Sequence, residues 1–362
     1  MQLSEMLKQL VERNGSDLHL VAGSTPTLRI AGNLTPIDGA GAIGRVDVRD
    51  LLASYLSERQ QTMLDDKADV MTSIVTDETY TSNNYGGAAR FRCCAFWDRN
   101  GVGASFRVIP SKIPTLAQLF EPERETLFRR LADMRRGLIV VAGMVGSGKS
   151  TTTAAMVETI NNERAERIFT IEDPIEYVYS GKKSLISQRE VGTDVDSYEQ
   201  GGLSALRSDP DVVVVGEFRT PEAVRIALAL ADTGHLVFAT LQADSVTESV
   251  RRLVEAFPDN KATMRRMLAR SLNAIIAQRL LPRASGEGRV PANEIMLVNS
   301  RIRRMIDEGD TDFTLAIEAG RDQGMCTMDD CVLELYREGT IDYEKAWINI
   351  MDRDRLGRRP TE

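Results

Sequence analysis

A short glycine-rich stretch, Gly143 to Ser150, constrains this chain more than any other feature. Residues 137–142 before it are apolar and mostly β-branched, which predicts a buried strand, and residues 151–160 after it contain good helix formers. A glycine loop between a strand and a helix is the setting of a P-loop, where backbone N–H groups and the helix N-terminus surround a polyphosphate. We therefore expect this chain to bind a nucleotide.

Each residue type in the loop has an expected task. The backbone curls at the glycines, Lys149 brings a positive charge to the phosphates, and Ser150 offers a hydroxyl group to Mg²⁺. The alternative interpretation is a glycine-rich turn that joins a strand to a helix and binds nothing. The predicted nucleotide-binding residues of the loop are Gly143, Gly146, Ser147, Gly148, Lys149, Ser150 and Thr151.

Size and charge limit the class of protein. With 362 residues, the chain is long enough for two domains, and its net charge of −8 disfavours general binding to nucleic acid. No apolar run reaches the roughly 18 residues of a membrane span. Residues 1–10 have the spacing of an amphipathic helix and lack the cationic start of a signal peptide. We expect a cytoplasmic protein that binds no nucleic acid.

The four cysteines form no CxxC pair. Cys93 and Cys94 are adjacent on a predicted strand, so their side chains point to opposite faces and do not share a metal ion easily. Cys326 and Cys331 lie near the C-terminus. We expect four reduced thiols and no zinc site.

Residues 1–109 are predicted to form a small α+β domain. A linker over 110–115 follows, because Pro110 and Pro114 do not continue a strand or a helix. Helices are expected over 3–13, 48–56 and 58–65, and strands over 16–21, 27–30, 33–37, 70–75, 88–97 and 102–109.

Residues 116–362 are predicted to form the second domain. After the P-loop, β-rich runs over 168–171, 212–215 and 236–239 alternate with helical stretches, which predicts a doubly wound α/β sheet that is mainly parallel. A phosphate site is expected at the carboxyl end of such a sheet. Helices are then expected over 247–257, 261–280, 300–308, 313–323, 326–338 and 342–351.

Acidic residues follow two of these predicted strands. The segment 172–176 follows strand 168–171, and Glu217 ends the valine run 212–215. Carboxylates at the end of a buried strand are costly unless they face water, a metal ion or a nucleotide. Glu217 has the Walker B arrangement, in which the acid reaches Mg²⁺ or its water. Structural carboxylates in solvated turns are the alternative.

Polar residues also flank the strand expected over 236–239. His235 precedes this strand and Gln242 follows it. A polar side chain here could sense the γ-phosphate of a nucleotide, so we assign both residues a nucleotide-linked role. For His235, the alternative is a core histidine whose ring nitrogens are both hydrogen-bonded.

Together, these segments resemble the PilT/PilU family of type IV pilus retraction ATPases, within the secretion ATPase superfamily. The resemblance covers nearly the whole chain. Residues 143–150 are similar to the family's Walker A loop, 172–176 to its Asp box, 209–217 to its Walker B segment and 233–242 to its His box, and 16–20, 188–192 and 302–309 are similar to further family motifs.

This resemblance implies a RecA-like P-loop ATPase domain preceded by a smaller PAS-like α+β domain. It also implies a homohexameric ring that uses ATP and Mg²⁺, with Glu176 as general base and Glu217 as the acid linked to Mg²⁺. In the superfamily, arginines of the N-terminal domain reach phosphates across the ring. By position these are Arg92 and Arg107 here, with Arg207 as a further candidate.

A family member would drive type IV pilus retraction, and so twitching motility, by removing pilin subunits. Its partners would be the inner-membrane platform protein of the pilus and possibly a paralogous pilus ATPase. It would be a peripheral protein of the inner membrane, and it would attach to the membrane only through these partners. Gln242 stands where the family usually has a second histidine. An ATPase of type II or type IV protein or DNA secretion, and a weakly hydrolysing nucleotide-gated regulator, remain alternatives.

Overall fold

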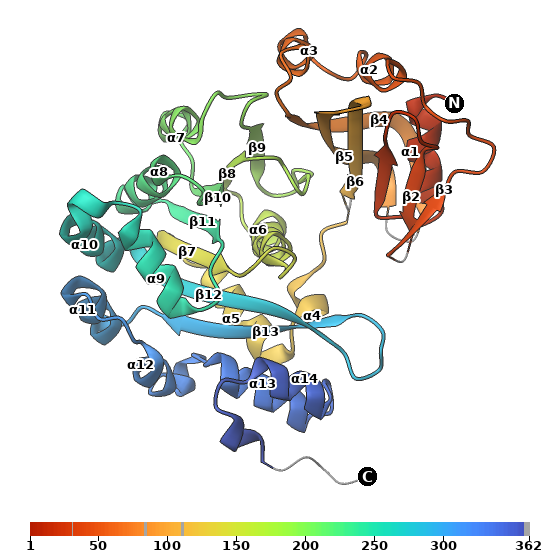
Figure 1. The fold of residues 1–362 in the computed structure, drawn as a ribbon. Coiled ribbons are helices and arrows are strands. Elements are labelled where there is room, and N and C mark those ends of the chain that lie inside the picture. Colours follow the sequence, from red (N-terminus) through yellow and green to blue (C-terminus); the bar gives the residue numbers. More distant parts are fainter. Residues whose placement is uncertain (31, 83–84, 110–111, 358–362) are drawn as a thin grey trace. The chain divides into compact units, whose positions relative to one another are not determined.

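The computed structural model describes residues 1–30, 32–82, 85–109 and 112–357, which fall into two compact units (Figure 1). The first unit comprises residues 1–113 together with the short segment 174–178, and the second comprises 114–173 and 179–362. Part of the predicted linker, residues 110 and 111, lies outside the described residues. The inclusion of 174–178 in the first unit was not predicted from the sequence.

The first unit is built on an antiparallel sheet with the strand order β3-β2-β1-β6-β5-β4. Apolar side chains of α1 pack with those of the sheet in one core, which includes Leu7, Leu18 and Phe106. The elements of this unit are α1 (Leu3–Glu12), β1 (Asp17–Leu20), β2 (Thr27–Ile30), β3 (Asn33–Pro36), α2 (Asp47–Leu52), α3 (Glu58–Asp65), β4 (Val70–Ser82), β5 (Tyr85–Asp98) and β6 (Gly101–Ile109).

The second unit alternates helices and strands, as the sequence predicts. Its first part contains α4 (Leu116–Leu119), α5 (Pro122–Ala132), β7 (Gly137–Ala142), α6 (Lys149–Glu163), β8 (Arg167–Glu172), β9 (Leu185–Glu190), α7 (Tyr198–Leu206), β10 (Val212–Glu217), α8 (Pro221–Asp232) and β11 (Leu236–Leu241). Its second part contains α9 (Val246–Glu255), η1 (Pro258–Asn260), α10 (Lys261–Ser271), β12 (Leu272–Pro282), β13 (Arg289–Leu297), α11 (Ser300–Glu308), α12 (Thr314–Glu318), η2 (Arg321–Gln323), α13 (Met328–Arg337), α14 (Tyr343–Asn349) and η3 (Arg353–Leu356).

These strands form a sheet in the order β13-β12-β7-β11-β10-β8-β9, parallel except for β13. Side chains alternate between its faces: Leu138 and Val140 pack with α8 to α10, whereas Ile139 and Val141 pack with α5 and α6. Helices therefore cover both faces, and the sheet is buried between them. The predicted doubly wound α/β fold is confirmed.

One predicted helix of this unit is wrong. The sequence favours a helix over 261–280, but α10 ends at Ser271 and the chain continues directly as β12. Strand β12 pairs with β7 in parallel and with β13 in antiparallel orientation. These partners lie far away in sequence, and pairing with them decides the conformation of an apolar run that local propensity leaves ambiguous.

In the part of the chain that the structure describes, no helix combines the length and the apolar composition needed to span a bilayer.

Candidate nucleotide-binding site

The P-loop begins where the fully buried strand β7 ends at Ala142. Gly143, Gly146 and Gly148 all have positive φ angles, of 152°, 80° and 86°. A Cβ atom at position 143 would lie 2.3 Å from Ser147 Oγ and 2.4 Å from the carbonyl oxygen of Gln278. The curl of this loop thus requires glycine, both for its backbone angles and for its close approach to neighbouring atoms.

Lys149 is the first residue of α6, and only 8% of its surface is exposed. Its Nζ donates hydrogen bonds to the carbonyl oxygens of Gly143 at 2.9 Å and Met144 at 3.2 Å, and lies 3.8 Å from Glu217 Oε1. The ammonium group is therefore held over the loop at the N-terminus of a helix, where an anion is stabilised.

The loop also contains a buried polar atom to which no described residue is hydrogen-bonded. Ser147 is 7% exposed, and no described residue forms a hydrogen bond with its Oγ. A buried polar atom without a partner is costly, and an oxygen of a bound phosphate group would remove that cost. The glycine curl, the buried ammonium group and this hydroxyl fit a polyphosphate.

Acidic residues meet the P-loop at the carboxyl edge of the sheet. Glu217 ends β10 and is aligned with Thr240 near the end of β11. It accepts a hydrogen bond from Arg219 Nε at 2.6 Å, and Arg219 Nη1 lies 3.5 Å from Asp173 Oδ2. Arg219 links the two acidic segments, and sequence reasoning missed it because it lies in an irregular segment beyond the strand. Ser150 lies in the first turn of α6.

Among the described residues, no group of three or more His, Cys, Asp or Glu side chains could hold a metal ion. At nucleotide sites, Mg²⁺ is usually bound by one or two side chains together with phosphate oxygens and water.

Gln242 and His235 lie at opposite edges of the sheet. Gln242 follows β11 at the carboxyl edge, where Gly143 N donates to the carbonyl oxygen of Leu241 at 3.1 Å. His235 precedes β11, and its carbonyl oxygen accepts a hydrogen bond from Gly137 N at 2.9 Å. A six-residue strand such as β11 spans about 20 Å. His235 thus lies at the edge of the sheet away from the P-loop of its own chain, and its nucleotide-linked role stays a prediction.

The ring of His235 has local partners instead. Its Nδ1 lies 2.9 Å from the carbonyl oxygen of Leu230 and 3.1 Å from Thr233 Oγ1. These contacts hold the C-terminal end of α8 against the start of β11. They match the alternative interpretation, a core histidine with both ring nitrogens hydrogen-bonded, only in part, because His235 is half-buried and these partners bind Nδ1.

Arg207 also lies away from the P-loop of its own chain. It follows α7, is exposed, and precedes β10, so it lies on the amino side of the sheet. The P-loop lies on the carboxyl side of the same sheet. The predicted role of Arg207 is a phosphate contact across the ring, and it stays a prediction.

Arg92 and Arg107 lie in the first unit, directly opposite each other on β5 and β6, as predicted. Arg92 Nη2 lies 2.5 Å from Glu176 Oε1, and Glu176 belongs to the segment grouped with this unit. Arg107 Nε lies 2.9 Å from Asp17 Oδ1. The structure brings the predicted general base together with one predicted arginine.

A buried network of side-chain amides on β12 and β13 supports the P-loop, and the sequence did not predict it. Gln278 on β12 is 2% exposed, and its Nε2 donates to the carbonyl oxygen of Ser147 at 2.7 Å. Its Oε1 accepts hydrogen bonds from Thr152 Oγ1 at 2.9 Å and Asn293 Nδ2 at 3.0 Å. The signal in the sequence is a glutamine inside a mostly apolar run, for which local propensity favours a helix.

Residues 3–327 match the family described as Type II/IV secretion system protein. The type IV pilus retraction ATPase PilT of Pseudomonas aeruginosa is 40% identical over 96% of this chain and 97% of its own. The type IV pilus ATPase PilU of the same organism is 34% identical over 96% of this chain and 88% of its own. A crystal structure of the pilus retraction motor PilT with bound ADP superposes with a TM-score of 0.84, at 37% identity, and covers 98% of each chain.

Proposed function

Because the chain belongs to the PilT/PilU family of type IV pilus retraction ATPases, we propose that it hydrolyses ATP to power the retraction of a type IV pilus. The observation that carries the proposal is the P-loop itself, with Lys149 held over it and Glu217 beside it. The similarity to PilT with bound ADP extends over the whole chain, so it supports the same nucleotide site here.

In this proposal, the loop formed by Gly143, Gly146, Ser147 and Gly148 surrounds the phosphates of ATP, while the N–H of Gly143 keeps its hydrogen bond to the carbonyl oxygen of Leu241. Lys149 then exchanges its hydrogen bonds to backbone carbonyl oxygens for contacts with phosphate oxygens. Thr151, in the first turn of α6, also contacts the nucleotide in this proposal. Ser150 and Glu217 are the residues that would hold Mg²⁺, which when bound neutralises charge on the phosphates. Gln242 hydrogen-bonds to the γ-phosphate or to the attacking water.

Glu176 is the proposed general base, which takes a proton from the attacking water. Its ion pair with Arg92 means that the base and the arginine move as one element of the first unit. Arg107 lies opposite Arg92 and has an exposed side chain, so it is available to a phosphate. A guanidinium group suits this role because its planar fork matches pairs of phosphate oxygens.

The motor is proposed to be a homohexamer in the cytoplasm, at the inner face of the membrane. Its partners are the inner-membrane platform protein of the pilus and, where present, a paralogous pilus ATPase. In such a ring, Arg207 and His235 could serve a nucleotide only across a subunit interface, because both lie on the amino side of their own sheet.

The experiment compares steady-state ATPase activity and oligomer mass of the wild type with those of Glu217→Ala and Glu176→Ala. Glu222→Ala is the matched control, since Glu222 is an exposed glutamate in the first turn of α8. We expect turnover to be lost in both test variants and kept in the control. Turnover that persists in Glu217→Ala and Glu176→Ala would contradict the proposed chemistry.

The pilus assignment needs a cellular test. Each variant is expressed in a type IV piliated strain that lacks its own copy of this protein. We expect the wild type to restore retraction and twitching, and Glu217→Ala to leave the cells piliated but unable to retract. Normal retraction without this protein, together with a secretion defect, would favour the secretion ATPase alternative.

A further inference from the structure

Two cysteines flank the N-terminus of α13, away from the nucleotide site. Thr327 is the N-cap residue of this helix, and its Oγ1 accepts a hydrogen bond from Asp330 N at 3.1 Å. Cys326 is therefore the residue before the cap, and Cys331 is the fourth residue of the helix. Side chains at these two positions meet across the first turn, usually as an apolar staple. Here the staple consists of two thiols.

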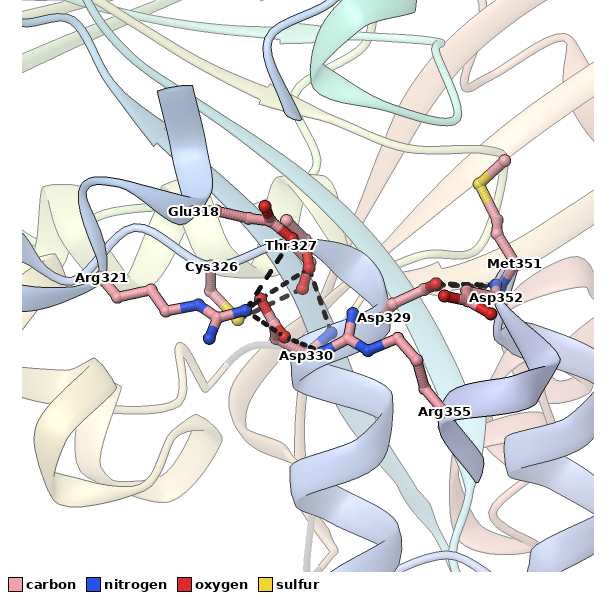
Figure 2. A network of polar contacts seen from close by, with 9 residues as sticks. All are labelled: Glu318, Arg321, Cys326, Thr327, Asp329, Asp330, Met351, Asp352 and Arg355. Carbon is pink, nitrogen blue, oxygen red and sulfur yellow. Dashed lines mark hydrogen bonds and ion pairs between the residues drawn. The ribbon is translucent and has the colours of Figure 1, made fainter. Parts of the chain in front are cut away.

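The backbone fixes both thiols in place. Cys326 forms an antiparallel bridge with Ile295 of β13, with N···O distances of 2.7 and 3.1 Å. Cys331 is fully buried in the core between α13 and β13, and its sulfur accepts a hydrogen bond from Asn293 N at 3.2 Å. Cys326 is partly buried against the same core. Figure 2 shows Cys326 beside the cap residue Thr327.

A cation lies next to this pair. Arg124 of α5 is mostly buried, and its Nη2 lies 2.5 Å from Glu334 Oε2. Its Nη1 is also buried, and no described residue accepts a hydrogen bond from it. A neighbouring guanidinium group favours the thiolate form of a cysteine, and the partly buried Cys326 gives this pair an edge outside the core.

The charge distribution assigns different roles to the two sulfurs. The side-chain hydrogen bond between the two cysteines lowers the pKa of Cys331; burial opposes this effect, and Arg124 and the Asn293 N–H group reinforce it. The same hydrogen bond, together with burial, raises the pKa of Cys326. Cys331, whose sulfur accepts the Asn293 N–H, is assigned the role of nucleophile, and Cys326, whose thiol donates to the carbonyl oxygen of Thr327, is assigned the role of resolving thiol.

We propose that Cys326 and Cys331 form a peroxide-sensitive site that closes reversibly to a disulfide. The Cys331 thiolate attacks one oxygen of hydrogen peroxide, the O–O bond breaks, and a sulfenic acid and hydroxide are formed. Cys326 then attacks the sulfenic sulfur, the S–S bond forms, and water leaves with the Cys326 proton. Two thiols and one peroxide give one disulfide and two waters.

The site is connected to the P-loop. Asn293 donates its backbone N–H to Cys331 Sγ and its side-chain Nδ2 to Gln278 Oε1, and Gln278 Nε2 donates to the carbonyl oxygen of Ser147. Disulfide formation draws the Cys331 sulfur toward Cys326 and disturbs this chain of hydrogen bonds at Asn293. We therefore expect oxidation to lower nucleotide affinity, a consequence that rests on the proposed ATPase function.

To test the proposal, the full chain is treated with hydrogen peroxide and the remaining thiols are blocked by alkylation. The peptides are then mapped by mass spectrometry. We expect the loss of two thiols per chain, a peptide that joins Cys326 to Cys331, and full reversal by dithiothreitol. In Cys326→Ser, Cys331 should accumulate as a sulfenic acid that dimedone traps. Cys94→Ser is the control, because Cys94 is a partly buried thiol outside this cluster.

The proposal is overturned if peroxide modifies Cys94 while Cys326 and Cys331 stay reduced, or if both are oxidised without becoming linked. ATPase assays form a separate arm. Activity should fall several-fold on oxidation of the wild type and of Cys94→Ser, return with dithiothreitol, and fall less in Cys326→Ser. A disulfide that forms without any change in nucleotide affinity refutes the coupling to the P-loop. Since peptide mapping needs no turnover, a protein without ATPase activity would still test the disulfide.

Discussion

Gln278 Nε2 donates a hydrogen bond to the carbonyl oxygen of Ser147 at 2.7 Å and so joins β12 to the P-loop. The same side chain accepts hydrogen bonds from Thr152 and Asn293. Removing it leaves several buried polar groups unsatisfied, at about 1–3 kcal/mol each. We predict that Gln278→Ala weakens ADP binding about tenfold or more, measured by titration calorimetry, because the loop loses its fixed conformation.

The control for this prediction is Gln323→Ala, since Gln323 is exposed in the same unit. It should bind ADP as the wild type does. Wild-type affinity in Gln278→Ala would mean that the loop holds its conformation without support from β12.

The glycines of the P-loop differ in how much space surrounds them. A Cβ atom at Gly143 would overlap Ser147 Oγ and the Gln278 carbonyl oxygen, whereas a Cβ at Gly146 would have no atom within 4 Å. We predict that Gly146→Ala costs only the strain of a left-handed backbone, about 1–2 kcal/mol. Gly143→Ala should abolish ADP binding. Equal ADP affinity of the two variants would contradict this distinction.

Local sequence determines the P-loop, and long-range pairing determines its support. The glycines, Lys149 and the flanking strand could be predicted because they are adjacent in sequence. Gln278 could not, because its run becomes a strand only through pairing with β7 and β13. The pairing of Glu176 with Arg92 likewise joins residues far apart in the chain. His235, by contrast, precedes its strand, so strand polarity alone could have placed it at the edge away from the P-loop.

Arg92 pairs with Glu176, whereas Arg107 does not. We predict that Arg92→Ala and Arg107→Ala each lower ATP turnover, by about 100-fold if they stabilise transition-state charge, and leave ADP affinity nearly unchanged. Because Arg92 and Glu176 act together, the double variant Arg92→Ala/Glu176→Ala should be little worse than Glu176→Ala alone. Arg99→Ala, in an exposed hairpin turn, is the control.

Unchanged turnover in both single variants would remove these arginines from the mechanism. If the fold-reduction in turnover of the double variant equals the product of the fold-reductions of the two single variants, the ion pair has no role in catalysis.

Asp330 stabilises the start of α13 through charged hydrogen bonds (Figure 2). Burial alone would raise its pKa, but hydrogen bonds from Arg355, Thr327 and Arg321 outweigh burial and hold the pKa below its ordinary value of 3.8. A lowered carboxyl pKa contributes stability above the unfolded-state value, and this contribution is lost as pH falls through the folded-state value. Asp330→Asn should therefore destabilise this region by about 1 kcal/mol at pH 7.

The measurement is the urea midpoint of wild type and Asp330→Asn between about pH 7 and pH 3. The difference between them should stay constant near neutrality and shrink below about pH 4, where the carboxyl group is protonated first in the unfolded chain and, at lower pH, in the folded protein. Asp322→Asn, an exposed neighbour, should match the wild type throughout. A difference that grows as pH falls would have the wrong sign for this assignment.

Gln242 and His235 flank the same strand but lie at its opposite ends, and only the end with Gln242 adjoins the P-loop. If Gln242 contacts the γ-phosphate, Gln242→Ala should lower the affinity for a non-hydrolysable ATP analogue about tenfold and leave ADP affinity unchanged, because a hydrogen bond to a charged group contributes about 1.5–3 kcal/mol. His235→Ala should leave both affinities unchanged in the isolated protomer and lower only thermal stability, since its ring bonds to α8 and Thr233. If His235→Ala lost affinity for the ATP analogue and Gln242→Ala did not, the γ-phosphate contact would belong to His235 and not to Gln242.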